Sequence, residues 1–262
     1  DIKALMVFLA GPRQCGKTTL SRIIATGYKA HFFDLEDPVD LERLQAAPKI
    51  TLEPLNGLII LDEIQRLPEL FPLLRVLADR NESGIKFLIL GSASPHLLKN
   101  ASESLSGRIS FIDMSGFTLD EIDKQENEKL WFRGGFPRSF LSPNDDAGYS
   151  WRNNFIRTFL ERDLPQLGIN IPSPALRRFW TMLAHYHGQI WNGAEFARSL
   201  AVSQPTSRNY LDILSSPYVV RQIQPWHENL KKRQVKSPKI YIRDSGILHT
   251  LLTLQDNQIL SH

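Results

Sequence analysis

The sequence predicts an α/β fold in which helices cover both faces of a parallel sheet, followed by a mostly helical second part. Two observations carry this prediction. In the first half of the chain, short continuous apolar runs alternate with stretches of helical periodicity, which is the composition of strands buried on both faces. The first of these runs also ends in a glycine-rich turn that opens a helix. With 262 residues, of which 42% are apolar, the chain is long enough to form one large domain or two medium ones.

The elements of the first half follow from these patterns. Apolar runs predict five strands, at Ala4–Ala10, Ala30–Leu35, Leu58–Leu61, Phe87–Leu90 and Ile109–Met114. Helical spacing predicts three helices, at Lys17–Thr26, Pro38–Ala47 and Leu67–Ala78.

The second half begins with a polar, turn-rich stretch, residues 117–148, in which Gly134–Pro137 and Ser142–Asp146 break any long helix. A helix is expected over Tyr149–Leu164, and the prolines that follow mark a joint. The remainder is typical of a small winged-helix unit with a helix-turn-helix. Its predicted helices are Ala175–His187, Ala194–Leu200 and Pro205–Leu214, and its wing strands are Tyr218–Gln222 and Lys239–Ile242. We therefore expect an α/β domain at 1–118, a helical lid or linker at 119–174 and a winged-helix-like domain at 175–262.

The charge is distributed unevenly between the two halves. Residues 1–130 hold 15 Lys and Arg against 19 Asp and Glu, whereas residues 131–262 hold 16 against 9. A basic half can attract a polyanion, although a cationic solvated surface explains the same composition. The single cysteine, Cys15, excludes a disulfide framework and suits a reducing cytoplasm, and no apolar run is long enough to span a membrane.

The strongest motif is Gly11-Pro12-Arg13-Gln14-Cys15-Gly16-Lys17-Thr18, which fits the phosphate-binding pattern GxxxxGK[ST] between a strand and a helix. The N–H groups of such a loop and of the helix that follows point at a phosphate. Lys17 would neutralise phosphate charge, and Thr18 would offer a hydroxyl to Mg²⁺. The expected nucleotide-binding residues are Gly11, Pro12, Arg13, Gln14, Cys15, Gly16, Lys17, Thr18 and Thr19.

A second motif, Leu58–Glu63, is an apolar strand that ends in two carboxylates. In a nucleotide-hydrolysing site Asp62 would lie in the second coordination shell of Mg²⁺, and Glu63 would orient or activate the attacking water. Because a kinase needs no such glutamate, Glu63 favours hydrolysis over phosphoryl transfer. Gln65 could hydrogen-bond near this water or cap a helix, and we favour the structural role.

Two further positions are candidates for sensing the γ-phosphate. Ser92 follows the fourth strand, beside the expected phosphate site, with Ser94 as a second option that equally suits a helix cap. Arg108 precedes the fifth strand and could reach a γ-phosphate in its own or in a neighbouring subunit. Arg13 could contact the γ-phosphate or a partner subunit, or could pack outward.

The second helix of the predicted helix-turn-helix carries side chains that can contact DNA bases or phosphates. Winged helices also serve as protein-contact modules, so DNA and protein both remain candidate partners. The residues are Gln204, Thr206, Ser207, Arg208 and Asn209, together with Lys231, Lys232, Arg233, Lys236 and Lys239 around the wing.

These motifs, in this order, resemble the AAA+ superfamily, and GPRQCGKTTL, LDEIQ, GSAS, SLSGR and GGFP are similar to one prokaryotic family within it. Its members join an AAA-type ATPase to a C-terminal domain of unknown function. The second half shares FLERD, GQIWN, SPKIY and RDSG with that domain, so the resemblance covers nearly the whole chain.

The resemblance implies a sheet in the order 5-1-4-3-2, a site for ATP and Mg²⁺, and a winged-helix domain. By the same resemblance Glu63, Lys17, Arg108 and Ser92 take catalytic roles, and Thr18 and Asp62 bind the metal. Cys15 replaces the more usual valine. Family chains usually extend beyond both ends of this one, so we expect a fragment, and no nuclease-like acidic-lysine constellation is present. The sequence thus predicts a cytoplasmic ATPase, with a homo-oligomer formed through Arg108 as a candidate partner. The alternative is a nucleotide-gated binding switch with little turnover.

Overall fold

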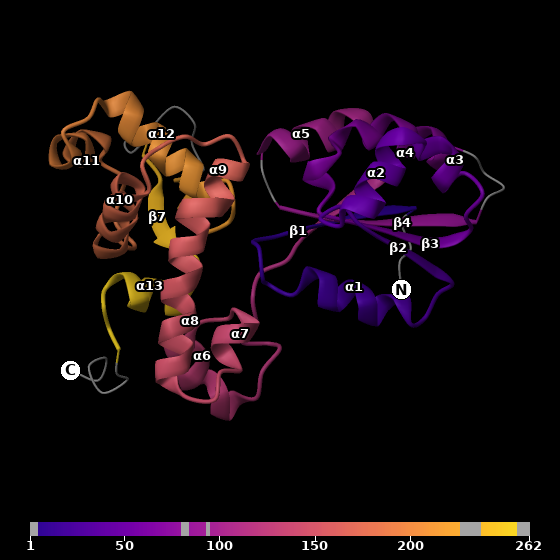
Figure 1. Cartoon of the computed structure of the whole chain (residues 1–262). Coiled ribbons are helices and arrows are strands. Elements are labelled where there is room, and N and C mark those ends of the chain that lie inside the picture. Colours follow the sequence, from indigo (N-terminus) through magenta and orange to yellow (C-terminus); the bar gives the residue numbers. More distant parts are fainter. Residues whose placement is uncertain (1–4, 80–83, 93–94, 226–236, 256–262) are drawn as a thin grey trace. The chain divides into compact units, whose positions relative to one another are not determined.

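The computed structural model describes residues 5–79, 84–92, 95–225 and 237–255, and the chain divides into two compact units, Asp1–Ser115 and Gly116–His262 (Figure 1). Each unit is described by itself. The finer division at residues 118 and 174 stays a prediction. Among the described residues, no helix is both long enough and apolar enough to cross a membrane.

The first unit contains a five-stranded parallel sheet. Its strands are β1 (Met6–Ala10), β2 (Ala30–Asp34), β3 (Gly57–Asp62), β4 (Ile85–Gly91) and β5 (Ile109–Asp113). Their order across the sheet is β2-β3-β4-β1-β5, which confirms the order expected from the resemblance. Because all neighbouring strands are parallel, the carboxyl ends of β1, β3 and β4 meet at the same edge.

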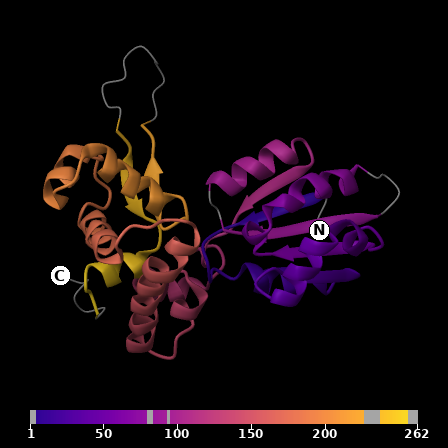
Figure 2. The ribbon, with the colours of Figure 1, turned by 45° about the horizontal axis from the view of Figure 1, so that its top comes forward.

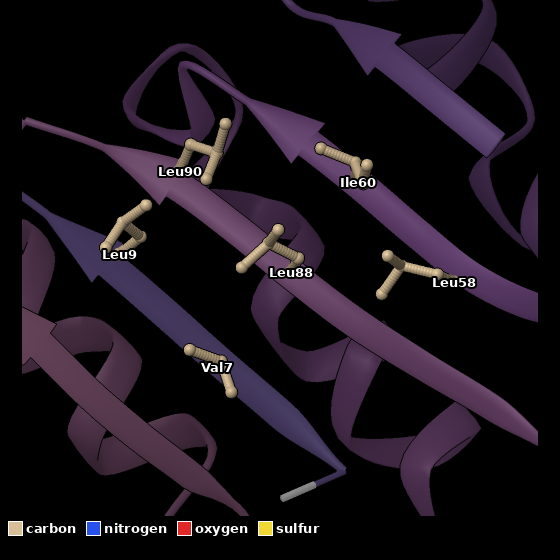
Figure 3. Packing of buried hydrophobic residues seen from close by; sticks show 6 residues of the cluster. All are labelled: Val7, Leu9, Leu58, Ile60, Leu88 and Leu90. Atoms are coloured by element: carbon tan, nitrogen blue, oxygen red, sulfur yellow. The ribbon is translucent and has the colours of Figure 1, made fainter. Parts of the chain in front are cut away.

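The sheet is buried on both faces, as its continuous apolar strands predict. On one face, alternate residues of three strands form a core cluster, against which Ile24, Ala25 and Tyr28 pack (Figure 3). The six residues of this cluster are Val7, Leu9, Leu58, Ile60, Leu88 and Leu90. Figure 1 shows helix α1 (Lys17–Ala25) on one face of the sheet and α4 (Phe71–Ala78) on the other. The strand residues that alternate with this cluster and point to the other face, such as Phe8, Ile59 and Phe87, are buried as well. The sheet is thus the middle layer between two layers of helices.

The remaining helices of this unit are partly new relative to the sequence prediction. Helix α2 (Pro38–Ala46) agrees with it, whereas α3 (Pro48–Leu52) and α5 (Pro95–Ser104) were not predicted. The helix expected from Leu67 begins only at Phe71. Two short 3₁₀ turns precede it, η1 (Ile64–Arg66) and η2 (Pro68–Leu70).

The second unit is mostly helical (Figure 2). Its first elements are η3 (Lys124–Glu126), α6 (Asn127–Arg133), α7 (Pro137–Phe140), α8 (Asp145–Thr158), the π-helical turn η4 (Phe159–Asp163) and α9 (Leu164–Gln166). Helix α8 begins four residues before the predicted Tyr149, because the side chain of Asn144 caps it by accepting from the Ala147 N–H at 2.8 Å. The residues read as turn signals therefore start a helix.

The later elements agree with the prediction in type and order. They are α10 (Ser173–His185), α11 (Gly193–Leu200), α12 (Gln204–Ser215), β6 (Val220–Ile223) and β7 (Lys239–Ile242). A further helix, α13 (Ser245–Leu251), follows them and was not predicted. Residues 201–203 join α11 to α12, and β6 pairs antiparallel with β7 from Val220↔Ile242 to Ile223↔Lys239. The basic residues Lys231, Lys232, Arg233 and Lys236 lie outside the described residues. The winged-helix interpretation stays a prediction.

Two glycine-containing motifs of the second unit meet although about a hundred residues separate them. The carboxylate of Asp244 accepts hydrogen bonds from the backbone N–H of Gly135 at 2.7 Å and of Ile247 at 2.8 Å. A Cβ at Gly134 would overlap this carboxylate, and a Cβ at Gly246 would overlap the carbonyl of Arg133. Glycine is thus required on both sides of this junction between α6 and α13.

Candidate functional site

The phosphate-binding motif forms the loop between β1 and α1, at the carboxyl edge of the sheet. Two residues of the loop have left-handed backbones, Gln14 with φ 63° and Gly16 with φ 105°. Gly11 is required for a separate reason, since a Cβ there would overlap the carbonyl of Met114 at the end of β5. Helix α1 has neither a side-chain cap nor an acidic residue in its first turn. Its first N–H groups are therefore well placed for an anion.

Lys17 is buried at the start of α1, and its ammonium folds back over the loop. The Nζ atom donates to the carbonyl of Gly11 at 3.1 Å and of Pro12 at 2.7 Å. A buried ammonium needs such partners, and these two carbonyls take up two of its three N–H donors. The charge is thereby held inside the loop, where a phosphate would be cradled.

Thr18 and Asp62 are joined across the site by a hydrogen bond. The Thr18 hydroxyl donates to Oδ2 of Asp62 at 2.7 Å, although 44 residues separate the two in sequence. Asp62 ends β3 and is paired in register with Asp34 at the end of β2. Burial raises the pKa of the Asp62 carboxyl, the Thr18 hydrogen bond opposes that rise, and the charge of Asp34 adds to it.

Glu63, the next residue, is held in an unusual conformation. Its φ is 55°, a left-handed backbone that is uncommon for a residue with a side chain. Its N–H donates to Oδ1 of Asp62 at 2.9 Å, and its carboxylate accepts from the amide Nε2 of Gln65. Burial raises the pKa of Glu63, and the charges of Lys17 and Arg13 oppose that rise.

Ser92 lies at the tip of β4, between the ends of β1 and β3. Its N–H donates to Oε1 of Gln65 at 3.2 Å. Its hydroxyl is buried and has no hydrogen-bond partner within the described part of the chain, so it is a polar group that a ligand would satisfy. Ser94, the other option from the sequence, lies outside the described residues.

Arg108 lies away from these groups. Its guanidinium makes a two-point contact with the carboxylate of Asp79 at the end of α4, with Nη2 to Oδ2 at 3.0 Å. Strand β5 pairs with β1 from Met6↔Ile109 to Ala10↔Asp113. Arg108 lies just before the first residue of β5, whereas the phosphate-binding loop follows the last residue of β1. The length of a five-residue strand, about 16 Å, therefore separates them. Arg108 thus belongs to the amino edge of the sheet.

Arg13 and Glu36 connect the loop to the end of β2. Nη2 of Arg13 lies 3.5 Å from Oε1 of Glu36. Glu36 and Asp34 were not among the predicted site residues, although the strand AHFFD also ends in a carboxylate and so carries the signal that identified Asp62. The role of the Gln65 amide could not be read from its position in the sequence.

The residues present fit a Mg²⁺ ion accompanied by a nucleotide. No group of three His, Cys, Asp or Glu side chains that could hold a metal occurs among the residues described. A hydroxyl and a carboxylate within hydrogen-bond distance are instead the oxygen donors that Mg²⁺ takes from a protein when phosphates supply the rest. Thr18 and Asp62 provide that pair.

Some of the predicted DNA-contacting residues on α12 are engaged in contacts within the protein, and others are exposed. Ser207 is buried, and its hydroxyl donates to the carbonyls of Gly193 and Gln204. The hydroxyl of Thr206 is paired with the capping Ser203 at 2.8 Å. Gln204, Arg208 and Asn209 are exposed, and Arg208 lies 3.3 Å from Asp212.

Comparison with known proteins supports this description. Residues 3–123 match the family described as AAA domain, which is a P-loop nucleotide-binding domain, and residues 124–258 match the Domain of unknown function (DUF8612). Two curated relatives are Uncharacterized protein Rv2008c of Mycobacterium tuberculosis and Uncharacterized protein Mb2031c of Mycobacterium bovis. Each is 54% identical over 254 residues, covering 97% of this chain and 57% of the relative. The chain thus spans just over half the length of these relatives.

Solved structures to which the chain is similar include the RuvB Holliday junction branch migration motor of Thermotoga maritima. It is 20% identical with a TM-score of 0.39, over 83% of this chain and 81% of that one. A Drosophila ORC structure with AT-rich DNA and Cdc6 is 12% identical with a TM-score of 0.30, over 96% and 87%. The fold assignment rests on strand order and the family matches rather than on these distant likenesses. The chain belongs to the family in which an AAA domain is followed by the domain of unknown function DUF8612.

Proposed function

We propose that this protein binds ATP with Mg²⁺ at the carboxyl edge of the β1–β5 sheet and hydrolyses it to ADP and phosphate. The observation that carries the proposal is the hydrogen bond between Thr18 and Asp62 directly beside Glu63. It unites a metal-binding pair, a phosphate-binding loop and a candidate base. Hydrolysis of a nucleoside triphosphate uses all three, because the loop binds the phosphates, the pair binds Mg²⁺ and the base orients the water.

Phosphate binding would be the task of the loop and of α1. The loop N–H groups and the first turn of α1 would hold the β-phosphate, as helix amino ends do for anions. On binding, the ammonium of Lys17 would exchange the carbonyls of Gly11 and Pro12 for phosphate oxygens. Thr18 and Asp62 would hold Mg²⁺, which neutralises phosphate charge when bound.

Hydrolysis would depend on Glu63 and Ser92. The Glu63 carboxylate would accept a hydrogen bond from the attacking water and orient it toward the γ-phosphate. General-base assistance of this kind typically contributes about 10²–10⁴ in rate. The buried, unpartnered hydroxyl of Ser92 would donate to a γ-phosphate oxygen. These groups stabilise spread negative charge rather than form covalent bonds.

Arg108 would complete the site of a neighbouring subunit. It lies at the amino edge of the sheet, about 16 Å of strand from its own phosphate-binding loop, which is too far for a side-chain contact. Its contact with Asp79 would hold the guanidinium at the surface until a second copy of the chain presents its nucleotide. This role implies a homo-oligomer in the active state.

A second candidate function is a nucleotide-gated switch that binds DNA or protein with little turnover. The basic composition of residues 131–262 and the exposed Gln204, Arg208 and Asn209 of α12 favour it. Salt-dependent DNA retention, measured with and without ATP, distinguishes this function. Absence of salt-sensitive binding in either state would exclude DNA as the partner.

Binding and turnover of nucleotide, measured on wild type and Lys17→Ala, test the leading proposal. Wild type should bind ATP in the presence of Mg²⁺ and release phosphate, and Lys17→Ala should do neither at the same concentration. Lys49→Ala, which removes an exposed lysine of α3 outside the site, serves as the matched control. Phosphate release at the same rate by Lys17→Ala and wild type would refute the site assignment.

A further inference from the structure

The side chain of Gln65 bridges two parts of the site that follow the neighbouring strands β3 and β4 and are far apart in sequence. Its Nε2 donates to the carboxylate of Glu63, and its Oε1 accepts from the N–H of Ser92 at 3.2 Å. Gln65 belongs to the 3₁₀ turn η1, directly after β3, whereas Ser92 follows β4. One side chain therefore ties the candidate base to the strand tip that carries the candidate phosphate sensor.

The orientation of this amide is fixed by its two partners. A glutamine has a donor end and an acceptor end, and only one of its two orientations serves a carboxylate and an N–H together. The opposite orientation would place the amide oxygen against the Glu63 carboxylate and the amide N–H₂ against the Ser92 N–H. Both contacts would then be repulsive.

Packing also restricts the position of the amide. A Cβ on Gly91 would lie 3.1 Å from Oε1 of Gln65 and 3.0 Å from Cγ2 of Ile64. These distances are tighter than an ordinary contact, so the absence of a side chain at residue 91 leaves room for the amide. The end of β4 thus fits the bridge closely.

The backbone of Glu63 needs such support. Its φ of 55° is a conformation that costs energy for a residue with a side chain, and structure around it must hold it there. Asp62 holds its N–H, and Gln65 holds its carboxylate. Four charged groups also act on this carboxylate, namely Lys17, Arg13, Asp62 and Glu36. The hydrogen bond from the Gln65 amide is separate from these charge interactions.

We propose that Gln65 is a positioning residue for ATP hydrolysis, which orients the carboxylate of Glu63 and fixes it relative to Ser92. This inference rests on the proposed function. Because its amide reaches Glu63 and the main chain of Ser92, Gln65 acts through Glu63 and does not itself contact the nucleotide. Misplacement of a reacting group by about 1 Å can cost on the order of 10²-fold in rate.

Two substitutions separate positioning of Glu63 from support of β4. Gln65→Met keeps the length of the side chain and loses both hydrogen bonds. Gln65→Glu keeps an acceptor for the Ser92 N–H but places a carboxylate against Glu63. Positioning predicts that both variants lose about 10- to 100-fold in kcat, with ATP affinity and KM nearly unchanged. Support of β4 alone predicts that Gln65→Glu keeps the wild-type kcat, and that result would overturn the proposal.

A double-mutant cycle with Glu63→Gln supplies the second readout. Once Glu63 has lost its carboxylate, replacing Gln65 should not lower the rate further. Additive losses would mean that Gln65 acts independently of Glu63 and would also overturn the proposal. Gln45→Glu, at an exposed position on α2, controls for the added charge, and thermal unfolding of each variant establishes that it is folded.

The outcomes for the two proposals are distinguishable. Absence of phosphate release by wild type would contradict the proposed function. A wild type that hydrolyses ATP, a Glu63→Gln variant that does not, and a Gln65→Met variant with unchanged kcat would contradict only the role of Gln65. If Gln65→Met does not fold, Gln65→Glu and the Gly91→Ala variant, which presses on Oε1, still test the role. Both should lower kcat without changing ATP affinity.

Discussion

The hydroxyl of Thr18 donates to the carboxylate of Asp62 across 2.7 Å, and this contact joins the first turn of α1 to the end of β3. The neighbouring N–H of Glu63 donates to the other oxygen of the same carboxylate. Asp62 is buried, and the charge of Lys17 lowers the pKa of its carboxyl while burial raises it. The charged form of this buried carboxylate is therefore not fully compensated in the unliganded site.

Asp62→Asn should stabilise the protein without nucleotide while it abolishes Mg²⁺-dependent binding. Burial raises the pKa of Asp62, so the folded state favours the neutral carboxyl. The free energy of unfolding is therefore larger when Asp62 is protonated, and this contribution is lost as the pH rises through the raised pKa. At neutral pH an asparagine removes that cost and can keep both hydrogen bonds, because a hydroxyl also accepts. Thermal unfolding should give a higher Tm than wild type without ligand and no further rise with ATP and Mg²⁺. A lower ligand-free Tm that still rises with Mg²⁺ and ATP would contradict the assignment.

Arg108→Ala should lower hydrolysis by about 10³-fold or more while ATP still binds, since an arginine supplied from a partner contributes roughly 10³–10⁵. Co-expression of Arg108→Ala with Lys17→Ala should restore part of the activity that each lacks alone. In the mixed assembly, one copy binds ATP and the other supplies the arginine. Arg75→Ala, which removes another exposed arginine of the same unit, should have little effect. No recovery in demonstrably mixed assemblies would argue against a role across the interface.

Acid should destabilise the second unit in part through His249. This side chain is buried between Trp131 and Phe132, and burial lowers its pKa. A histidine with a lowered folded pKa contributes stability above its unfolded pKa and loses it as the pH falls toward the folded value. Between pH 7.5 and 5, the Tm of His249→Gln should therefore fall less than that of wild type. His185→Gln, on an exposed position of α10, should behave like wild type; equal falls for all three proteins would count against this account.

Gly134→Ala should destabilise the second unit by about 3 kcal/mol or more. Gly134 has φ 75°, and an added Cβ would overlap the Asp244 carboxylate, which two backbone N–H groups hold in place. The unfavourable backbone alone costs on the order of 1–3 kcal/mol, and the overlap adds to it. Gly168→Ala is the matched control, since Gly168 has φ 80° with nothing within 4 Å of its added Cβ. Equal losses of unfolding free energy in urea would show that the Asp244 contact contributes nothing.

Much of the site was predictable because its geometry follows from strand order and direction. Once β1 and β3 are parallel and separated by β4, the loop after β1 and the carboxylates after β3 must share an edge, which brings Thr18 to Asp62. The same reasoning places Arg108 on the opposite edge, because it precedes β5.

Other features depend on contacts that no local pattern encodes. The sequence pattern predicts the start of α8 too late, because Asn144, Asp145 and Asp146 resemble a turn although they form a cap and an acidic first turn. The bond from Gly135 to Asp244 joins residues 109 apart, and no periodicity reports it. The bridge of Gln65 depends on one side-chain conformation, which the motif LDEIQ does not reveal.

The central claim is that Glu63 activates water at a site that holds ATP, and phosphate release by Glu63→Gln tests it most directly. Phosphate release should be measured at saturating ATP and Mg²⁺, with bound ATP quantified in the same preparation. We predict that the variant binds ATP as tightly as wild type and releases phosphate about 10²–10⁴-fold more slowly. Equal rates of phosphate release by the variant and wild type would contradict the account.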